Sequence, residues 1–431
     1  MSGKSRLLII GGTGEFGALY ARLMKRKFDV GIISRDVDKA RIAAEKIGVD
    51  ACDFSEISNA DIVIVSVPIS AAVETVKKAI PLMKRDALLM DFTSVKVPVI
   101  KTMSEFEGEV AGCHPMHGPR VESLAGLCVV FVPVRKGPKY NEITQFFDEE
   151  GAKIYETSAE EHDKLLSVVQ VLTHYIYISA GATIGEAGID TKKLPYFSSP
   201  VFEITMDMVA RVLGQNPHVY SQIQTTNPYA SEIRKLFLEN AEKLARISED
   251  KNEEEFLSFF AKSAKGIGNI ENKLWSSDKV ISAMQHERAW LKSMIGRKIA
   301  LKNLNSGIVH FGILEDVGID RVRMRCGKRI FELNLPYVRV LNEQETRDWK
   351  IKSVEAASRD LSFVFEDYDD ETLKEFAMGI DEDILDVNIV DKYEIKGKKS
   401  VTLRFSIFPE RVKEVENKIK LKFKGIGAII R

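Results

Sequence analysis

Short apolar runs alternate with helical patterns over the first 150 residues. Five runs are nearly continuous in apolar character and end at turn residues: "RLLIIGG", "FDVGIIS", "ADIVIVSVP", "ALLMDFTS" and "LCVVFVP". Such runs predict strands that are buried on both faces, as in a parallel sheet covered by helices. We therefore predict an α/β fold that begins with a doubly wound Rossmann domain over residues 1–152.

A helical pattern replaces these strands over residues 153–290. The run "LLSVVQVLTHYIYISA" (165–180) is apolar nearly all round, which predicts a buried helix, in the middle of a bundle or in a subunit interface. Ser158 and Glu161 fit a capping box at the start of this helix. We predict an all-α dimerisation and substrate domain here.

Short strands return in the last third of the chain. "KIALKN", "GIVHFGILED", "RVRMRC", "KRIFELN" and "YVRVL" are separated by turn residues. They predict a small β-barrel over residues 291–345. "NEQETRDWKIK" then reads as a charged linker. Residues 352–431 follow the order strand, helix, strand, strand, helix, strand, which predicts an α+β ferredoxin-like domain.

The composition narrows the class of protein and its partners. The 431 residues are 45% hydrophobic and 29% charged, and 62 basic against 63 acidic residues leave a net charge of −1. No bulk positive field favours nucleic acid or an anionic membrane. The four cysteines form no CxxC pair, which argues against a metal site or a disulfide framework. With no signal peptide and no apolar run of membrane-spanning length, we predict a cytoplasmic protein without a membrane partner.

The first predicted strand leads into the glycine-rich turn "GGTGEFG". Gly12, Gly14 and Gly17 have GxGxxG spacing, with Thr13 between them, after a strand and before a helix. In that context the pattern indicates dinucleotide binding. We predict that Gly12 permits the tight turn, Gly14 lets the backbone approach the pyrophosphate, and Gly17 lets helix and strand pack closely.

The end of the second predicted strand selects the nucleotide. NAD-binding domains usually have Asp or Glu there to hold the ribose 2′-hydroxyl, whereas "VGIISRD" has Ser34 and Arg35. A hydroxyl and a guanidinium suit a 2′-phosphate, so we favour NADP over NAD. Asp36 keeps NAD open, because a shift of one residue would restore an acidic contact, and Arg35 could instead be a solvated loop charge. Val67 and Pro68, at the end of the next predicted strand, complete the predicted cofactor-binding set.

Three further stretches supply candidates for chemistry. Ser94, in "DFTSVK", follows a strand and should lie at the carboxyl end of the sheet, where α/β domains place ligands. His114, in "CHPMHGP", belongs to the next connection, predicted as a loop, and histidine is the usual general base near neutral pH. "ARVLGQNPHVYSQI" places Arg211 on a helix before a break, and arginine can anchor a carboxylate.

Together these motifs resemble the prephenate dehydrogenases of tyrosine biosynthesis. "GGTGEFG", "DFTSVK", "GCHPMHGP", "LTHY" and "ARVLGQNPHVYSQI" occur in that family's order, over roughly residues 6–285. The resemblance implies oxidative decarboxylation of prephenate to 4-hydroxyphenylpyruvate with NAD(P). It implies that His114 takes the proton of the substrate's 4-hydroxyl with help from Ser94, that Arg211 holds a carboxylate, and that His174 lines the side-chain end of the pocket.

The chain departs from the familiar bacterial pattern at some positions. Tyr220, which we include among the substrate-binding residues, stands where tryptophan is common, so arogenate remains an alternative to prephenate. His117 reads as loop filler, and His162 as a hydrogen-bonding residue at a helix start with no catalytic role. His174 could equally be a satisfied core histidine, and Arg211 a surface residue in an ion pair.

The last segment has a resemblance of its own. "SRDLSFVFEDYDDETLKEF", "DVNIVDKYEIKGKKSVTLRFSIF" and "IGAIIR" are similar to the anticodon-binding ferredoxin-like domain of the phenylalanyl-tRNA synthetase β chain. We weigh a regulatory site for tyrosine or phenylalanine equally with a scaffold that widens a dimer interface, and both above an RNA-contacting surface. For RNA the candidates are Lys396, Lys398, Lys399 and Arg404, with Phe405 for stacking.

Two other functions compete with a homodimeric prephenate dehydrogenase. A 3-hydroxyacid dehydrogenase usually has a catalytic lysine followed four residues later by asparagine, but "EEHDKLLSV" has Lys164 and then Val168. An RNA-binding regulator with a relict dehydrogenase domain would not need Ser94, His114 and all three glycines intact. Both are therefore weaker hypotheses.

Overall fold

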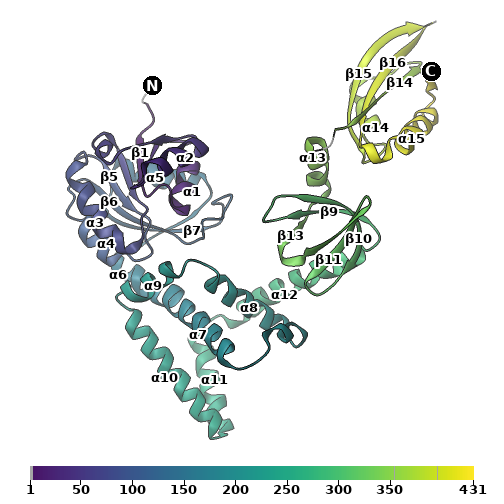
Figure 1. Cartoon of the computed structure of the whole chain (residues 1–431). Helices are drawn as coiled ribbons and strands as arrows, with labels where there is room; N and C mark the ends of the chain where they lie inside the picture. Colours follow the sequence, from purple (N-terminus) through teal and green to yellow (C-terminus); the bar gives the residue numbers. More distant parts are fainter. Residues whose placement is uncertain (1–2, 354, 396) are drawn as a thin grey trace. The chain divides into compact units, whose positions relative to one another are not determined.

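The chain forms two compact units, Met1–Ile270 and Glu271–Arg431. The computed structural model in Figure 1 describes residues 3–353, 355–395 and 397–431. The finer division into four domains, at residues 1–152, 153–290, 291–345 and 352–431, stays a prediction.

An eight-stranded sheet organises the first unit, in the order β3-β2-β1-β4-β5-β6-β7-β8. Its strands are β1 (Arg6–Ile10), β2 (Asp29–Ile33), β3 (Asp50–Ala51), β4 (Ile62–Val65), β5 (Leu88–Asp91), β6 (Glu109–Pro115), β7 (Cys128–Arg135) and β8 (Lys153–Glu156). The order β3-β2-β1-β4-β5-β6 is that of a Rossmann-type fold, as predicted. Strand β7 pairs antiparallel with β6, and β8 pairs parallel with β7, so the sheet is mixed rather than wholly parallel. The apolar pattern does not distinguish the two cases, because both faces are covered in either.

Helices cover both faces of this sheet (Figure 1). They are α1 (Glu15–Met24), α2 (Val37–Ile47), α3 (Ile69–Ala79), α4 (Val97–Met103) and α5 (Pro138–Glu149), with short 3₁₀ turns at Phe54–Asn59 and Ile80–Leu82. Leu7 and Ile9 of β1 pack in a core with α1 and α5, whereas Leu8 and Ile10 pack with α3 and α4. The alternation of side chains along each strand therefore supplies two separate apolar layers.

Strand β6 was missed by the sequence analysis, and the correction moves His114 from a loop to a strand. His114 pairs with Val130 of β7 and lies one residue before the end of β6. Gly112, Cys113 and Pro115 give this segment weak strand propensity, so only its pairing between β5 and β7 makes it a strand. His114 therefore has a rigid backbone.

Helices make up the rest of the first unit. They are α6 (Ala159–Leu166), a π-helical turn (Ser167–Leu172), α7 (Thr173–Glu186), a 3₁₀ turn (Thr191–Tyr196), α8 (Pro200–Leu213), α9 (Pro217–Thr226), α10 (Ala230–Glu249) and α11 (Glu253–Ile267), and α12 (Ile270–Ser293) begins at the boundary. Ser158 caps α6 by accepting a hydrogen bond from Glu161 N. The Glu161 carboxylate accepts from Thr157 Oγ1, so the reciprocal half of the predicted capping box is absent among these contacts.

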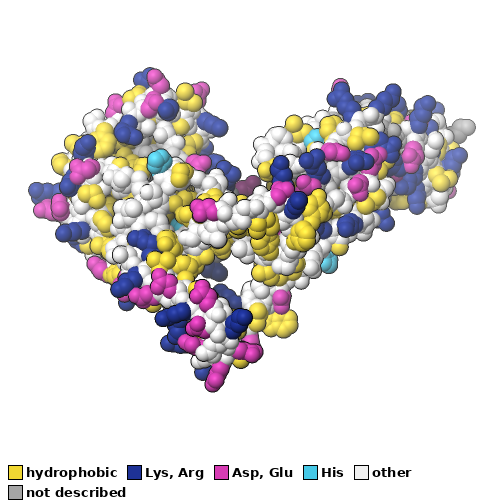
Figure 2. Space-filling view, turned by 60° about the horizontal axis from the view of Figure 1, so that its bottom comes forward, with side chains coloured by type: hydrophobic (Ala, Val, Ile, Leu, Met, Phe, Trp, Pro, Cys, Tyr) yellow, Lys and Arg dark blue, Asp and Glu magenta, His cyan; other side chains and the backbone are white. Residues whose placement is uncertain are grey.

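The apolar run 165–180 is only partly buried in the single chain, so the structure does not show the burial predicted for the middle of a bundle. Helix α7 has no fully buried residue, and hydrophobic side chains such as Val168, Val169 and Ile176 are exposed. Figure 2 shows hydrophobic side chains spread over the molecular surface. By length and composition, Ala159–Glu186 could also cross a membrane, so the expectation that no run reaches that length is wrong. The alternative that the sequence analysis kept, a subunit interface, agrees with this exposure.

The second unit contains two antiparallel sheets. The first has the order β12-β11-β10-β9-β13 and comprises β9 (Lys298–Asn303), β10 (Val309–Val317), β11 (Arg321–Cys326), β12 (Arg329–Asn334) and β13 (Val338–Val340). The second has the order β15-β16-β14-β17, with β14 (Ala357–Phe365), α14 (Asp370–Met378), β15 (Ile384–Ile395), β16 (Lys398–Ile407), α15 (Val412–Gly425) and β17 (Ile429–Ile430). Both α14 and α15 contribute to its apolar core.

The predicted charged linker is a helix, α13 (Glu343–Ser353). Its Lys350 is buried and pairs with Asp383 at 2.6 Å, and the ammonium lies 4.6 Å and 4.8 Å from the ring centroids of Phe311 and Phe408. These contacts come from distant parts of the chain, so the local sequence gave no sign of them.

Candidate active site

The glycine loop between β1 and α1 has the shape that a dinucleotide requires. Gly11, rather than the predicted Gly12, takes the left-handed backbone of the turn, with φ of 86°. A Cβ on Gly12 would lie 2.4 Å from Ile32 Cβ, and one on Gly17 would lie 2.5 Å from Gly11 O. Gly14 precedes α1 without a side-chain cap, so the N–H groups of the first turn can receive a pyrophosphate.

Val67 and Pro68 border the same loop. They lie between β4 and α3, and Pro68 is the residue before the first turn of α3. A Cβ on Gly11 would lie 2.3 Å from Ser66 O and 3.1 Å from Val67 Cγ1. This close approach brings the predicted cofactor-binding residues of two strands to one edge of the sheet.

At the end of β2, Ser34 and Arg35 place a hydroxyl group and an exposed guanidinium near that edge of the sheet. Thr13 Oγ1 donates a hydrogen bond to Ser34 Oγ at 3.1 Å, and Arg35 is exposed. The Asp36 carboxylate caps α2 by accepting from Lys39 N at 3.1 Å, which lowers its pKa. Asp36 is thus engaged by its own helix.

Three side chains form a hydrogen-bonded chain at the carboxyl end of β6. His114 Nδ1 lies 2.9 Å from His162 Nε2, and His162 Nδ1 lies 2.8 Å from Asp163 Oδ1. The Asp163 carboxylate also accepts from the backbone N–H groups of Lys96 and Val97, each at 2.8 Å. All three side chains are buried, so each is held in one orientation.

These hydrogen bonds between Asp163, His162 and His114 determine which ring nitrogen carries each proton. The Asp163 carboxylate accepts a hydrogen bond from His162 Nδ1–H. In a neutral His162 the Nε2 atom then accepts from His114 Nδ1–H, and a lone pair remains on His114 Nε2. Burial, reinforced by His162 and Lys96, holds the pKa of His114 well below its ordinary value. His114 is therefore neutral near pH 7, with its basic nitrogen free to accept a proton.

A buried ion pair supports the residues around His114. Lys96 Nζ lies 2.7 Å from Asp91 Oδ2 and donates to Cys113 O at 2.8 Å, and both charged side chains are fully buried. Ser94 is half-buried in the loop between Asp91 and Lys96. The carbonyl of Cys113 immediately precedes His114, so this pair fixes the strand from which His114 projects.

The predicted substrate residues of the helical region lie together. The His174 ring meets the Tyr220 ring edge-on at 4.6 Å, and burial lowers the pKa of His174. Burial raises the pKa of Tyr220, while the nearby Arg211 cation opposes that shift. Tyr220 Oη also donates to Gln215 Oε1 at 3.2 Å.

Helix α6 and the turn after it connect this group to His114. Gln170, four residues before His174, has its Nε2 atom 3.5 Å from His114 Nε2. The helical segment that carries His174 therefore reaches His114 through Gln170.

The sequence analysis missed several residues of this site. It read His162 as a local hydrogen-bonding residue and assigned no role to Asp163 or Gln170. The adjacent His162 and Asp163 at a helix start were the one visible signal, but their partner His114 is known only from the fold. His117 is more than loop filler, because its Nε2 accepts from the buried hydroxyl of Tyr20 at 2.9 Å.

The residues predicted to contact RNA are engaged in other ways. Arg404 forms two hydrogen bonds with the Asp360 carboxylate, at 2.7 Å and 2.8 Å, and Lys399 is paired with Asp367. Lys398 lies 3.8 Å from Glu366, and Lys396 lies outside the described residues. Phe405 is fully buried against the helices and cannot stack on a base, so that part of the prediction is wrong.

Comparison with known proteins gives a consistent result. Residues 20–156 match the family model for the nucleotide-binding domain of prephenate dehydrogenase, and residues 158–262 match the model for its dimerization domain. The chain is 33% identical to a probable arogenate/prephenate dehydrogenase of Methanocaldococcus jannaschii, over 97% of each chain. It is 34% identical to the T-protein of Haemophilus influenzae over 51% of this chain and 55% of that protein.

A solved structure shares the fold of the first part of the chain. It is the crystal structure of prephenate dehydrogenase from A. aeolicus in complex with hydroxyphenyl propionate and NAD+, with 20% identity and a TM-score of 0.50. The similarity covers 62% of this chain and 99% of that one.

Replacing Lys96 by methionine should destabilise the fold by about 3–5 kcal/mol, because Asp91 is then left as a buried charge without its cation. The double variant Lys96→Met/Asp91→Asn should recover much of that loss. Urea unfolding measures both, with Lys77→Met as the control, since its pair with Glu74 is exposed and contributes less than about 1 kcal/mol. A double variant no more stable than Lys96→Met would contradict this account of the pair.

Proposed function

The chain belongs to the prephenate dehydrogenase family, and we propose that it oxidises prephenate to 4-hydroxyphenylpyruvate and CO₂ with a nicotinamide dinucleotide. The observation that carries the proposal is the hydrogen-bonded chain of His114, His162 and Asp163 at the sheet edge. It leaves a neutral imidazole nitrogen on His114, next to Gln170 of the helical segment that continues to His174. A base of this kind is what oxidation of a carbinol needs.

The residues divide the reaction between them. Bound nicotinamide accepts the hydride that leaves C4 of the substrate. His114 Nε2 takes the proton of the 4-hydroxyl, and Ser94 orients that hydroxyl. When the bond from C1 to the carboxylate breaks and CO₂ leaves, the ring becomes aromatic and the oxygen recovers its proton from His114. Arg211 anchors a carboxylate of the substrate, and His174 and Tyr220 line the side-chain end of the pocket.

Prephenate is the substrate that we favour, and arogenate is the second candidate. The two differ in one group of the side chain, a keto group in prephenate and an ammonium in arogenate. The Arg211 cation near Tyr220 disfavours a second positive charge there, which supports the keto acid. The name of the M. jannaschii relative includes both substrates.

NADP is the cofactor that we favour over NAD. Arg35 is exposed beside Ser34 at the end of β2, where a 2′-phosphate would lie. Asp36 is held at the start of α2 by Lys39, which weakens the case for an acidic contact with the ribose.

A cytoplasmic homodimer is the assembly that we propose. Exposed apolar side chains on α7, α8 and α10, in the region matched by the dimerization-domain model, support a second copy as their cover. They also give the apolar Ala159–Glu186 a role that needs no membrane.

For the second unit we propose a small β-barrel and a ferredoxin-like domain. The strand order β15-β16-β14-β17, with helices after β14 and β16, supports the ferredoxin-like assignment. The paired cations and the buried Phe405 make RNA the weaker partner for this unit.

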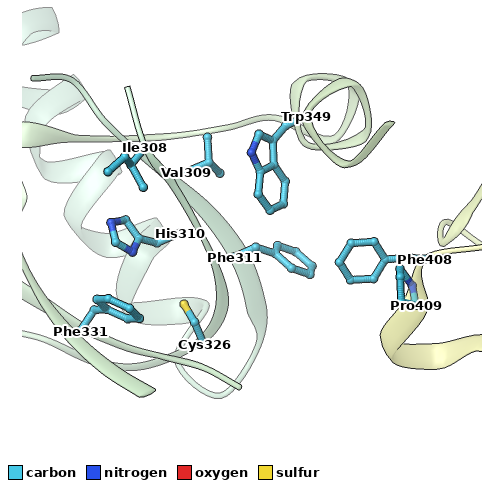
Figure 3. A pocket seen from close by; sticks show the side chains of 9 residues that line it. All are labelled: Ile308, Val309, His310, Phe311, Cys326, Phe331, Trp349, Phe408 and Pro409. Carbon is cyan, nitrogen blue, oxygen red and sulfur yellow. The ribbon is translucent and has the colours of Figure 1, made fainter. Parts of the chain in front are cut away.

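We also propose that the second unit binds tyrosine or phenylalanine as an effector. A hollow of about 560 Å³ lies among aromatic side chains there, within the usual size of a small-molecule site of about 300–1,000 Å³. Figure 3 shows the rings of Phe311 and Phe408 next to each other, with Trp349 beside them, and the two phenylalanine rings meet edge-on. The ring centroids of Phe408 and Trp349 lie 5.7 Å and 6.0 Å from that of Phe311, so an aromatic side chain would find ring partners.

Reduction of the nicotinamide, followed by absorbance with prephenate as substrate, tests the catalytic proposal. His114→Asn should lower kcat by about 10²–10⁴-fold with little change in KM, the usual effect of losing a general base. His286→Asn, on the exposed part of α12, serves as the matched control for the histidine variant. Arg211→Ala should mainly raise KM for the substrate. Because the pKa of His114 is lowered, kcat/KM should fall with decreasing pH only below about 6.5. Equal activity of His114→Asn would end the assignment.

Arg35→Asp should shift the cofactor preference from NADP toward NAD, because it exchanges a phosphate ligand for a 2′-hydroxyl ligand. The ratio of kcat/KM for the two cofactors measures the shift, and Arg41→Asp, an exposed position on α2, is the control. An unchanged ratio would show that Arg35 does not contact the nucleotide.

Calorimetric titration with tyrosine and with phenylalanine tests the effector proposal. The wild-type protein should bind one of them, and Ile308→Glu should abolish binding by placing a charge at the rim of the hollow. Ile330→Glu, which is equally exposed but outside the hollow, should bind normally. Absence of binding to the wild-type protein would overturn the proposal.

A further inference from the structure

Gln170 lies in a distorted turn of the long helix that passes the candidate site. Residues Ser167–Leu172 are π-helical, between α6 and α7. A π-turn inside an α-helix costs backbone hydrogen bonds and is most often retained where it serves a function. It changes the direction of the side chains that follow α6, and Gln170 is the one that reaches His114.

Neighbouring side chains support this turn. Gln224 Nε2 donates to Val171 O at 2.7 Å, and Thr173 Oγ1 donates to Val168 O at 3.3 Å. The carbonyl groups of this turn therefore accept from one side chain of α9 and from one at the start of α7.

The amide of Gln170 faces the basic nitrogen of His114. Its Nε2 atom lies 3.5 Å from His114 Nε2, a long contact between a donor and a lone pair. Since His114 Nδ1 donates to His162, only the NH₂ end of the amide suits this neighbour. Gln170 Oε1 is buried and, among the described residues, has no hydrogen-bond partner.

We propose that Gln170 is a catalytic residue that donates a hydrogen bond to the 4-oxygen of the substrate while His114 takes the proton from it. The inference rests on the proposed function and adds a group that the sequence motifs do not contain. Two nitrogens 3.5 Å apart leave room for one oxygen at about 3 Å from both. The hydroxyl donates to His114 Nε2 and accepts from Gln170 Nε2.

The role of this donor follows from the charge on the oxygen. As the proton moves to His114 and the hydride leaves C4, the oxygen gains negative charge before the carbonyl forms. After CO₂ leaves, the electron pair of the broken bond enters the ring, and the oxygen becomes a phenolate until His114 returns the proton. A donor aimed at this atom stabilises it at both stages.

Two variants separate this role from packing. Gln170→Met keeps the length of the side chain but has no donor, and should lower kcat by about 10²-fold, as expected for loss of one donor to a developing anion. Gln170→Glu places a carboxylate beside His114, raises the pKa of that histidine and should move the acid limb of kcat/KM to higher pH. Gln145→Met, on the exposed face of α5, is the control.

A second readout does not depend on turnover. The pH titration of the His114 ring signals, followed by NMR, reports the protonation of that side chain in the free protein. Its pH midpoint should rise in Gln170→Glu and stay unchanged in Gln145→Met. The same midpoint in Gln170→Glu and wild type would overturn the contact between Gln170 and His114.

The outcomes distinguish the two proposals. Wild-type protein that turns over neither prephenate nor arogenate would refute the proposed function and the role of Gln170 with it. An active wild type with an equally active Gln170→Met variant would refute the role of Gln170 alone. A loss of kcat in Gln170→Met together with a raised midpoint in Gln170→Glu would support both.

Discussion

The geometry of the candidate site depends on one residue, Lys96. Its backbone N–H donates to Asp163 and its ammonium pairs with Asp91 and donates to the carbonyl of Cys113. Three elements, β5, β6 and α6, are thereby joined at one point. Because His114 follows Cys113 and His162 precedes Asp163, the distance between the two imidazoles is set by these bonds. Burying the Lys96–Asp91 pair costs desolvation free energy, and in this site the pair holds the neighbouring side chains in one orientation.

The contacts around Lys96 and Asp163 also control the protonation of His114. The ionised carboxylate of Asp163 can only accept hydrogen bonds, so the direction of the hydrogen bonds along His162 and His114 is determined. The cation of Lys96 adds to burial in keeping His114 neutral. A neutral base in a buried position can exchange a proton with a bound hydroxyl without first losing one to water.

The helical region leaves more of its apolar side chains exposed in a single chain than the Rossmann domain does. An amphipathic helix normally buries its apolar stripe, but α7 is apolar nearly all round and has no fully buried residue here. The π-turn that carries Gln170 directly precedes α7, so the surface that we assign to a second copy continues from the candidate site. Assembly and chemistry thus share one helix.

Local patterns were enough to predict the Rossmann strands except β3, β6 and β8, the glycine loop, the helical region and all five strands over residues 294–342, because these depend on periodicity and turn residues. Residue type and place in the chain indicated Ser94, His114 and Arg211, and motif resemblance supplied their roles and added His174 and Tyr220. The strand position of His114, the helix over the charged segment at Glu343–Ser353, and the buried face of Phe405 required the fold. So did the chain from His114 through His162 to Asp163 and the approach of Gln170, since 48 and 56 residues separate His114 from His162 and from Gln170. A sequence specifies which groups can bond, but only the packing of distant segments decides which of them meet.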